Sequence, residues 1–288
     1  MTKMNKLIPL FVLPLLLTAC GNSNKVEKPK FAKYGDEVTF EVFTGELNTK
    51  SKEARVAFLQ DDETRLLNAS DDFSIDYRLS SEENAKEENT GIKEYSYINM
   101  HNTVKVDQEN KRAEGNLLVK SSYKGNREKD DPYYQENGNE KSEDYIYAEV
   151  KEDKFYYASS YKKEYKHMAL AEPAAFASSG VQACLDATGL ALLDVMFFGR
   201  LGLDSETTTH YVNGNVFTTV EVQGGVTVTR QAQYSDSECS YKMYSEGKGT
   251  ADDVETNGKG SATIIIKKGN VSVNAFDYSS YTDATLVI

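Results

Sequence analysis

Cys20 has the most distinctive chemical setting in this sequence of 288 residues. Two lysines near the N-terminus precede an apolar run over residues 7–17, and the small residues Thr18 and Ala19 lead from that run to the thiol. The run has 11 residues, whereas a membrane-spanning helix needs about 20. A cationic start, a short apolar segment and small residues before a cleavage point are typical of an export signal. The pattern predicts that residues 1–19 are a signal peptide and that the chain is cut directly before Cys20.

The motif Leu17-Thr18-Ala19-Cys20 resembles the lipobox of bacterial lipoproteins. The resemblance implies that a diacylglyceryl group is joined to Cys20 as a thioether and that a dedicated peptidase cleaves on its N-terminal side. It also implies attachment to the extracytoplasmic face of the cell membrane through fatty acyl chains such as palmitate. Two acyl chains hold a protein stably at a bilayer, whereas one gives only marginal binding. A plain secretory signal with an incidental cysteine is the alternative.

Cys184 and Cys239 are the two cysteines that remain. In an oxidising compartment outside the cytoplasm they could form a disulfide. A buried free thiol, which behaves as a small apolar side chain, is the alternative for each of them. The sequence leaves their pairing open.

Catalytic and metal-binding signatures are absent from the sequence. His101, His167 and His210 are scattered, and none has a second histidine three or four residues away, where both could lie on one helix face. The sequence also lacks H-E-x-x-H, C-x-x-C, G-x-S-x-G and G-x-x-x-x-G-K-[ST] motifs. We therefore predict a protein that is not an enzyme and has no metal or cofactor, with an unrecognised hydrolase as the less favoured reading.

The charge balance limits the possible partners. The chain has 33 Lys and Arg against 45 Asp and Glu, and removal of Lys3 and Lys6 with the signal leaves 31 minus 45, a net charge of −14. This acidity argues against nucleic acid as a partner, because phosphates attract clustered basic residues. It also argues against broad electrostatic adhesion to anionic lipid, so the lipid on Cys20 must provide the attachment.

The elements begin after a polar segment, residues 20–34, which we expect to be a lipidated cysteine followed by a flexible tether. Residues 35–288 are expected to form one domain. Apolar residues at helical spacing predict an amphipathic helix from about Asn48 to Asn68. A second helical block is expected at about 172–198, because it is rich in Ala and Leu and has Pro173 near its start and Gly199 after its end.

A period of two, which places alternate side chains on one buried face, predicts the strands. The first stretches with this pattern are residues 73–79, 92–100, 103–107, 115–123, 144–150 and 154–161. The pattern returns after Thr207 in residues 209–212, 216–222, 226–234, 241–246, 262–267, 271–276 and, as a last strand, 282–288. Asn213-Gly214 and Gly224-Gly225 are expected hairpin turns. Two charged stretches, residues 80–94 and 124–144, are expected to be solvated excursions.

About ten to twelve strands, mostly joined by hairpins, together with separate helices place the chain in the α+β class. A sheet this wide usually curls or closes. The order of elements over residues 45–288 resembles the LolA-like and LppX-like lipoprotein fold, in which helices cover the concave side of a curved antiparallel half-barrel. In that family the space between sheet and helices binds acyl chains. No diagnostic motif allows a family binding residue to be transferred to this chain.

The large apolar residues of the helical block suggest which side chains could line such a space. The expected ligand-lining residues are Phe58, Leu192, Leu193, Met196, Phe197 and Phe198. The first hypothesis is a non-catalytic, membrane-anchored protein that binds or carries a lipid or other amphiphile between sheet and helices. The alternative is a cell-envelope interaction module that presents its tyrosine-rich strands to a protein or glycan and holds no internal ligand. The ligand, the partner and the oligomeric state are not determined by the sequence.

Overall fold

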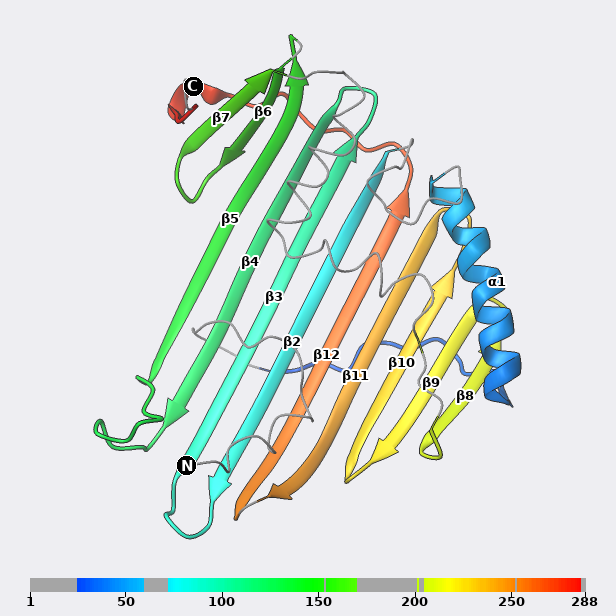
Figure 1. The fold of residues 1–288 in the computed structure, drawn as a ribbon, viewed down its shortest axis with the longest axis vertical. Coiled ribbons are helices and arrows are strands. Elements are labelled where there is room, and N and C mark those ends of the chain that lie inside the picture. The colour runs from blue at the N-terminus through cyan, green and yellow to red at the C-terminus, as the bar shows by residue number, and fades with distance from the viewer. Residues whose placement is uncertain are drawn as a thin grey trace.

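The computed structural model describes residues 25–59, 72–152, 154–169, 201, 205–251 and 253–285. Over these ranges the chain is mostly β, with one large open sheet of 13 strands and a single α-helix beside it (Figure 1). The predicted wide antiparallel sheet is confirmed, with more strands than expected. The predicted helical block at 172–198 lies outside the described residues.

Two runs of strands that are consecutive in the chain build the sheet. The first run consists of β2 (Phe73–Glu87), β3 (Lys93–Asp107), β4 (Arg112–Gly125), β5 (Gly138–Lys151), β6 (Lys154–Ser159) and β7 (Glu164–Ala169). The second run consists of β8 (Thr208–Asn213), β9 (Val216–Gln223), β10 (Val226–Tyr234), β11 (Glu238–Ala251) and β12 (Val254–Lys268).

Pairing of β12 with β2 joins the two runs, so the last long strand lies beside the first (Figure 1). Two short strands form the edges, β1 (Asp36–Val38) beside β8 and β13 (Thr282–Asp283) beside β7. The β13–β7 pair is parallel, and every other pair is antiparallel. The sheet is open because the two edge strands are not neighbours in it.

Glycines with positive φ close two of the hairpins in the second run. Gly224 and Gly225 have φ of 58° and 82° and form the two-residue turn between β9 and β10, as predicted. At the β8–β9 hairpin the register pairs Asn213 with Val216, so the turn residues are Gly214 and Asn215. The predicted hairpin is present there, with its turn one residue later than expected.

The charged stretches are strands over much of their length, so the prediction of solvated excursions was wrong there. β2 continues to Glu87 and β3 starts at Lys93, which leaves only a short hairpin between them. Residues 138–144 likewise belong to β5. These segments lack an apolar face. Backbone hydrogen bonds keep them extended, to both neighbouring strands for residues 80–87 and to β4 for residues 138–144.

The helix α1 (Phe40–Leu59) starts eight residues before its predicted start. Thr39 caps it, since its hydroxyl oxygen accepts a hydrogen bond from the backbone N–H of Val42 at 3.4 Å. Phe43, Leu47 and Ala54 are buried at helical spacing and face the sheet. The predicted continuation of the helix to Asn68 lies outside the described residues.

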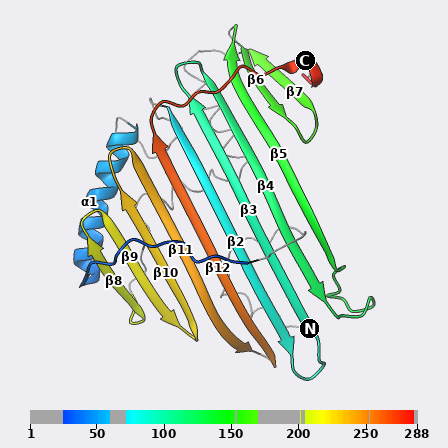
Figure 2. The ribbon, with the colours of Figure 1, turned by 180° about the vertical axis from the view of Figure 1, so that it is seen from behind.

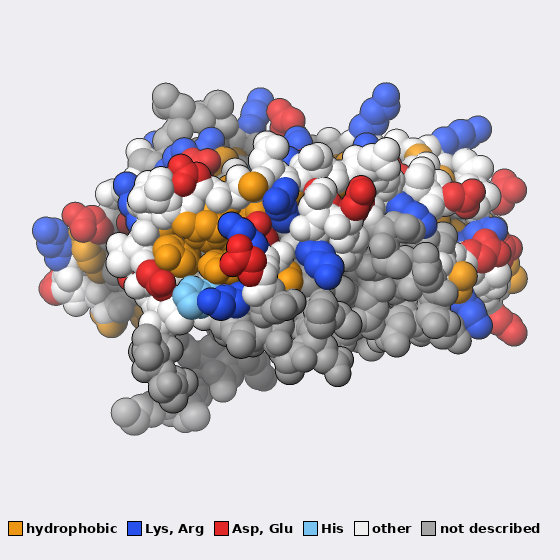
Figure 3. Space-filling model, turned by 90° about the horizontal axis from the view of Figure 1, so that it is seen from above, with side chains coloured by type: hydrophobic (Ala, Val, Ile, Leu, Met, Phe, Trp, Pro, Cys, Tyr) orange, Lys and Arg blue, Asp and Glu red, His pale blue; other side chains and the backbone are white. Residues whose placement is uncertain are grey.

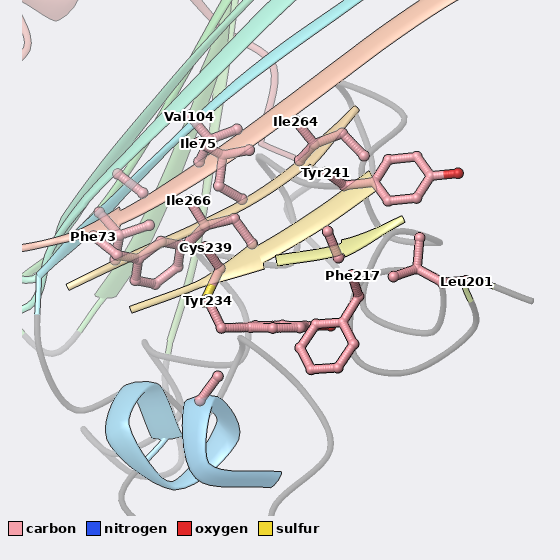
Figure 4. Close-up of a cluster of buried hydrophobic side chains, with 14 of the residues drawn as sticks. Phe73, Ile75, Val104, Leu201, Phe217, Tyr234, Cys239, Tyr241, Ile264 and Ile266 are labelled. Carbon is pink, nitrogen blue, oxygen red and sulfur yellow. The ribbon is translucent and has the colours of Figure 1, made fainter. Parts of the chain in front are cut away.

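The main core lies between α1 and the face of the sheet on which it packs, which we call the front face. Figure 4 shows Phe217 and Tyr234 pointing toward the helix, while Ile264 and Ile266 extend the apolar layer along β12. The ring of Phe217 is fully buried and lies 5.9 Å from that of Phe43, centroid to centroid. The apolar residues that alternate along the strands therefore form one continuous layer on the front face.

Both ends of the described chain cross the opposite, back face of the sheet (Figure 2). From Lys25 the N-terminal segment is held against the sheet, and Val26 is only 8% exposed. The expectation of a flexible tether through residue 34 was therefore wrong for residues 25–34. The predicted strand at 271–276 was also wrong, because this segment lies over the back face and pairs with no strand. Of the predicted last strand, only Thr282 and Asp283 form β13 within the described residues.

Candidate functional site

The front face continues the apolar core toward the β2–β3 hairpin. The registers align Met243, Ala262, Leu79, Met100 and Val119 in one row across β11, β12, β2, β3 and β4. Leu79 and Ala262 are buried, and the other three are half-buried. Because α1 packs mainly against β8 and β10 at one edge of the sheet, this row lies beyond the helix (Figure 1).

The next row of the front face has small side chains. Ser245, Gly260, Ser81 and Ser121 occupy it on β11, β12, β2 and β4, with Ile98 between the last two. A Cβ atom added to Gly260 would lie 2.7 Å from the Ser245 hydroxyl oxygen, so a larger side chain at that position needs a shift of its neighbour. An apolar row followed by a row of small residues suits the chain of an amphiphile, because it offers apolar contact without bulk.

A polar network ends the front face near the β2–β3 hairpin. The guanidinium of Arg127 donates to Glu94 at 2.8 and 3.1 Å and to Asp131 at 3.2 Å, and the Tyr123 hydroxyl donates to Glu94. Burial opposes ionisation of Glu94, but the hydrogen bonds from Arg127 and Tyr123 hold its pKa below the ordinary value. Burial, reinforced by the bond to Glu94, raises the pKa of Tyr123 to about 12. These groups satisfy one another, so the network is suited to holding the 126–137 loop in place.

The back face of β8 to β12 carries the N-terminal segment. Gln231 is the main anchor, since its amide oxygen accepts from the Ala32 backbone N–H at 2.7 Å and its amide nitrogen donates to the Ala32 carbonyl at 3.1 Å. Farther along, the Lys242 ammonium donates to the Lys30 carbonyl at 2.9 Å. The ammonium of Lys28 lies over the Tyr244 ring, 5.0 Å from its centroid.

The back face of β5 to β7 carries the C-terminal segment, which includes the 3-10 turn η2 (Tyr278–Ser280). Seven aromatic rings pack together there, from Tyr145, Tyr147, Tyr156, Tyr165, Phe276, Tyr278 and Tyr281. Seen from the top of Figure 1, toward one end of the strands, a patch of hydrophobic side chains has acidic, basic and histidine side chains at its margin (Figure 3). Four tyrosines of the tyrosine-rich strands, Tyr145, Tyr147, Tyr156 and Tyr165, are packed beneath the chain's own C-terminal segment.

Glu149 is the polar centre of this aromatic cluster. Its carboxylate is buried and accepts from the hydroxyls of Tyr147 at 3.0 Å and Tyr278 at 3.1 Å, and from Arg112 Nε at 3.4 Å. Burial, and then the adjacent Glu149 charge, raises the pKa of both tyrosines above their ordinary range.

Asp107 holds the start of the same segment. Its carboxylate accepts from the backbone N–H groups of Asn110 at 2.9 Å and Val273 at 3.1 Å. Burial alone would raise the pKa of Asp107, but these two hydrogen bonds, together with one from the Asn110 side chain and the charge of Arg112, keep that pKa below the ordinary value. Sequence reasoning missed both Asp107 and Glu149, because a buried carboxylate has the same local pattern as the many exposed ones.

Most of the predicted site residues lie where the structure gives no test. Cys20, Cys184 and the expected lining residues Leu192, Leu193, Met196, Phe197 and Phe198 lie outside the described residues. Phe58 belongs to α1, but its side chain is likewise outside the description.

Cys239 is fully buried on the front face and has no disulfide partner among the described residues. Burial raises the pKa of its thiol to about 12. The described ranges contain no group of three or more His, Cys, Asp or Glu side chains placed to hold a metal ion. They also contain no helix long and apolar enough to cross a membrane.

Comparisons with known proteins add no family. No family model matches the sequence, and no curated protein matches it. Among solved structures the chain is similar to the translocator domain of the autotransporter NalP from Neisseria meningitidis, with 7% identity and a TM-score of 0.21 over 80% of this chain and 100% of that one. A similarity of this size supports no inference about fold or function.

Proposed function

We propose that this chain is a membrane-anchored, extracytoplasmic lipoprotein without catalytic activity, which binds a lipid or other amphiphile against the front face of its sheet. The anchor is a diacylglyceryl group on Cys20. The ligand lies between the sheet and the predicted helical block at about 172–198, in a half-barrel arrangement. This extends the LolA-like and LppX-like resemblance to a specific surface of this chain.

The observation that carries the proposal is the apolar row from Met243 to Val119 on the front face. It continues the core across five strands beyond the edge that α1 covers, and three of its five side chains keep partial exposure. An apolar surface of this kind stabilises an acyl chain by removing both from water. The small residues of the next row leave space beside it.

The alternative of an interaction module that displays tyrosines has less support. Tyr145, Tyr147, Tyr156 and Tyr165 contact the C-terminal segment, so they are occupied within the chain itself. The most exposed tyrosines among the described residues are Tyr133 and Tyr161, which lie on different loops.

Ligand extraction tests the binding proposal. The chain from residue 20 with Cys20→Ser, purified without lipid attached, is extracted with organic solvent and analysed by mass spectrometry, and then titrated with a fluorescent fatty acid. Met100→Glu places a charge in the apolar row and is expected to abolish binding. Asn99→Glu is the matched control, because residue 99 points to the back face and its variant should bind as the parent does.

Urea unfolding of both variants separates lost binding from lost folding. A parent chain that yields no extractable ligand and binds no fatty acid would overturn the binding proposal. The anchor is tested independently by metabolic labelling with radioactive palmitate, which the full chain should incorporate and the Cys20→Ser chain should not.

A further inference from the structure

The N-terminal segment crosses the back face toward the middle of the sheet. Three contacts mark its path. Tyr34 packs against Tyr211 on β8, and Ala32 is bonded to Gln231 on β10. Lys28 lies over the ring of Tyr244 on β11. Figure 2 shows the segment continuing across β12 toward β2, over the central strands, and burial, with the charge of Glu27 as a lesser cause, raises the pKa of Tyr97 on β3.

Because this segment is docked on the sheet, Cys20 must lie closer to the folded domain than a free tether would allow. Lys25 follows Cys20 by five residues, which even when fully extended span no more than about 18 Å. A tether that was free through residue 34 would span up to about 50 Å. An anchored chain therefore keeps the back face of its central strands close to the lipid headgroups.

The back face of these strands is basic although the chain is acidic. On β2 to β5, β11 and β12 the registers place 13 Lys and Arg and nine Asp and Glu on the back face, a net charge of +4. The front face of the same strands has one Lys and five Asp and Glu, a net charge of −4. The excess negative charge therefore lies elsewhere in the chain.

Three of these lysines converge at one depression near the β2–β3 hairpin. Lys86, Lys93 and Lys124 line an open hollow of about 530 Å³ together with Tyr95, Asn257 and two acidic residues, Glu94 and Glu255, so the lysines outnumber the carboxylates by three to two. All three lysines are exposed, and Lys93 and Lys124 form no ion pair within the described part of the chain. Tyr95 lies two residues from Tyr97, or about 7 Å along the strand, so the hollow adjoins the start of the N-terminal segment.

We propose that this lysine-lined hollow binds the anionic headgroups of the membrane that holds Cys20, so that the chain rests with its back face on the bilayer. The inference rests on the proposed anchor at Cys20. Anionic leaflets attract lysines within about one Debye length, roughly 8 Å at physiological salt, so the local charge of this face decides the contact rather than the net charge of the chain.

Vesicle sedimentation tests the proposal with the chain from residue 20 carrying Cys20→Ser, in which no lipid can assist. Vesicles of phosphatidylcholine mixed with phosphatidylglycerol should bind the protein, and vesicles of phosphatidylcholine alone should not. A lysine at an anionic surface contributes about fivefold to the partition coefficient, so the triple variant Lys86→Gln, Lys93→Gln and Lys124→Gln should bind on the order of 100-fold more weakly.

A matched variant controls for the loss of three charges. Lys111, Lys162 and Lys166 are also exposed but lie outside the hollow, so their triple replacement by Gln should leave binding nearly unchanged. Equal losses of vesicle binding in both triple variants would overturn the proposal. Release of the protein from the vesicles by millimolar inorganic phosphate at constant ionic strength would also overturn it, because that result would indicate a site for small anions. Palmitate labelling tests the anchor at Cys20 separately, so a result against headgroup binding by the hollow can be distinguished from a result against the anchor.

Discussion

Removing the hydroxyl of Tyr278 should weaken the packing of the C-terminal segment, and the structure allows the loss of stability to be estimated. That hydroxyl donates to the buried carboxylate of Glu149 at 3.1 Å. The Tyr278 ring lies 4.9 Å from the rings of both Phe276 and Tyr165, and phenylalanine at this position would keep those contacts. Tyr278→Phe thus removes a hydrogen bond to a charged group and leaves the aromatic packing in place.

A hydrogen bond to a charged group contributes about 1.5–3 kcal/mol to stability, compared with about 0.5–1.5 kcal/mol between neutral groups. We expect Tyr278→Phe to lower the free energy of unfolding by about 2 kcal/mol, measured by urea denaturation at pH 7. Tyr281→Phe is the matched control in the same segment. Its ring packs on Phe276, and no described hydrogen bond involves its hydroxyl, so its effect should stay within about 0.5 kcal/mol.

A double-mutant cycle isolates the role of the charge. In the Glu149→Gln background the acceptor is neutral, so the cost of Tyr278→Phe should fall to about 1 kcal/mol. Equal effects of Tyr278→Phe and Tyr281→Phe would refute the reasoning, because the hydrogen bond to Glu149 would then contribute nothing to stability beyond a hydroxyl that lacks such a bond. An unchanged cost in the Glu149→Gln background would refute the part of it that concerns charge.

Four further outcomes follow from single residues. Phe217→Ala should lower the free energy of unfolding by about 3–5 kcal/mol in urea, because the ring is fully buried. Gly35→Ala should destabilise the β1 edge, with faster amide hydrogen exchange there, because its Cβ would lie 1.6 Å from the Val212 carbonyl oxygen. Cys239 should resist alkylation in the native protein at pH 8 and react after denaturation, because burial raises its pKa to about 12. Folding lowers the pKa of Asp107, so the contribution of Asp107 to stability is complete above the unfolded pKa of about 3.9 and is lost as the pH falls below that value. Asp107→Asn should therefore flatten the loss of stability measured between about pH 5 and pH 3.

The sequence predicted the strands best where one face is apolar and the other polar. Phe73, Ile75, Tyr77 and Leu79 alternate with polar residues because their side chains lie on the apolar front face. Gly224 has a positive φ because its two-residue turn requires one. The same reasoning failed for residues 80–87, because both faces of β2 are polar there and the strand is maintained by its neighbours. Pairing between distant strands leaves no local pattern.

The two terminal segments show a second limit. The alternation of residues 271–276 reflects packing of Val273 and Phe276 onto the back face, which has the same period as a strand. The N-terminal segment is hard to place from its sequence because backbone groups make many of its contacts, as with Ala32 and the amide of Gln231. Contacts of this kind depend on a residue 199 positions away, which no periodicity can indicate.

The two faces of the sheet therefore suit different partners. The back face carries both terminal segments and the lysine-lined hollow, and it is tied by Lys25 to within about 18 Å of Cys20. The front face carries the apolar row and, on the same six strands, a net negative charge, which would be repelled by an anionic leaflet. In the proposed orientation, with the back face on the bilayer, the apolar row would open away from the membrane. An amphiphile bound in that row would then already have left the membrane, so the two proposals together predict capture and transfer of a ligand on the aqueous side rather than extraction at the headgroups.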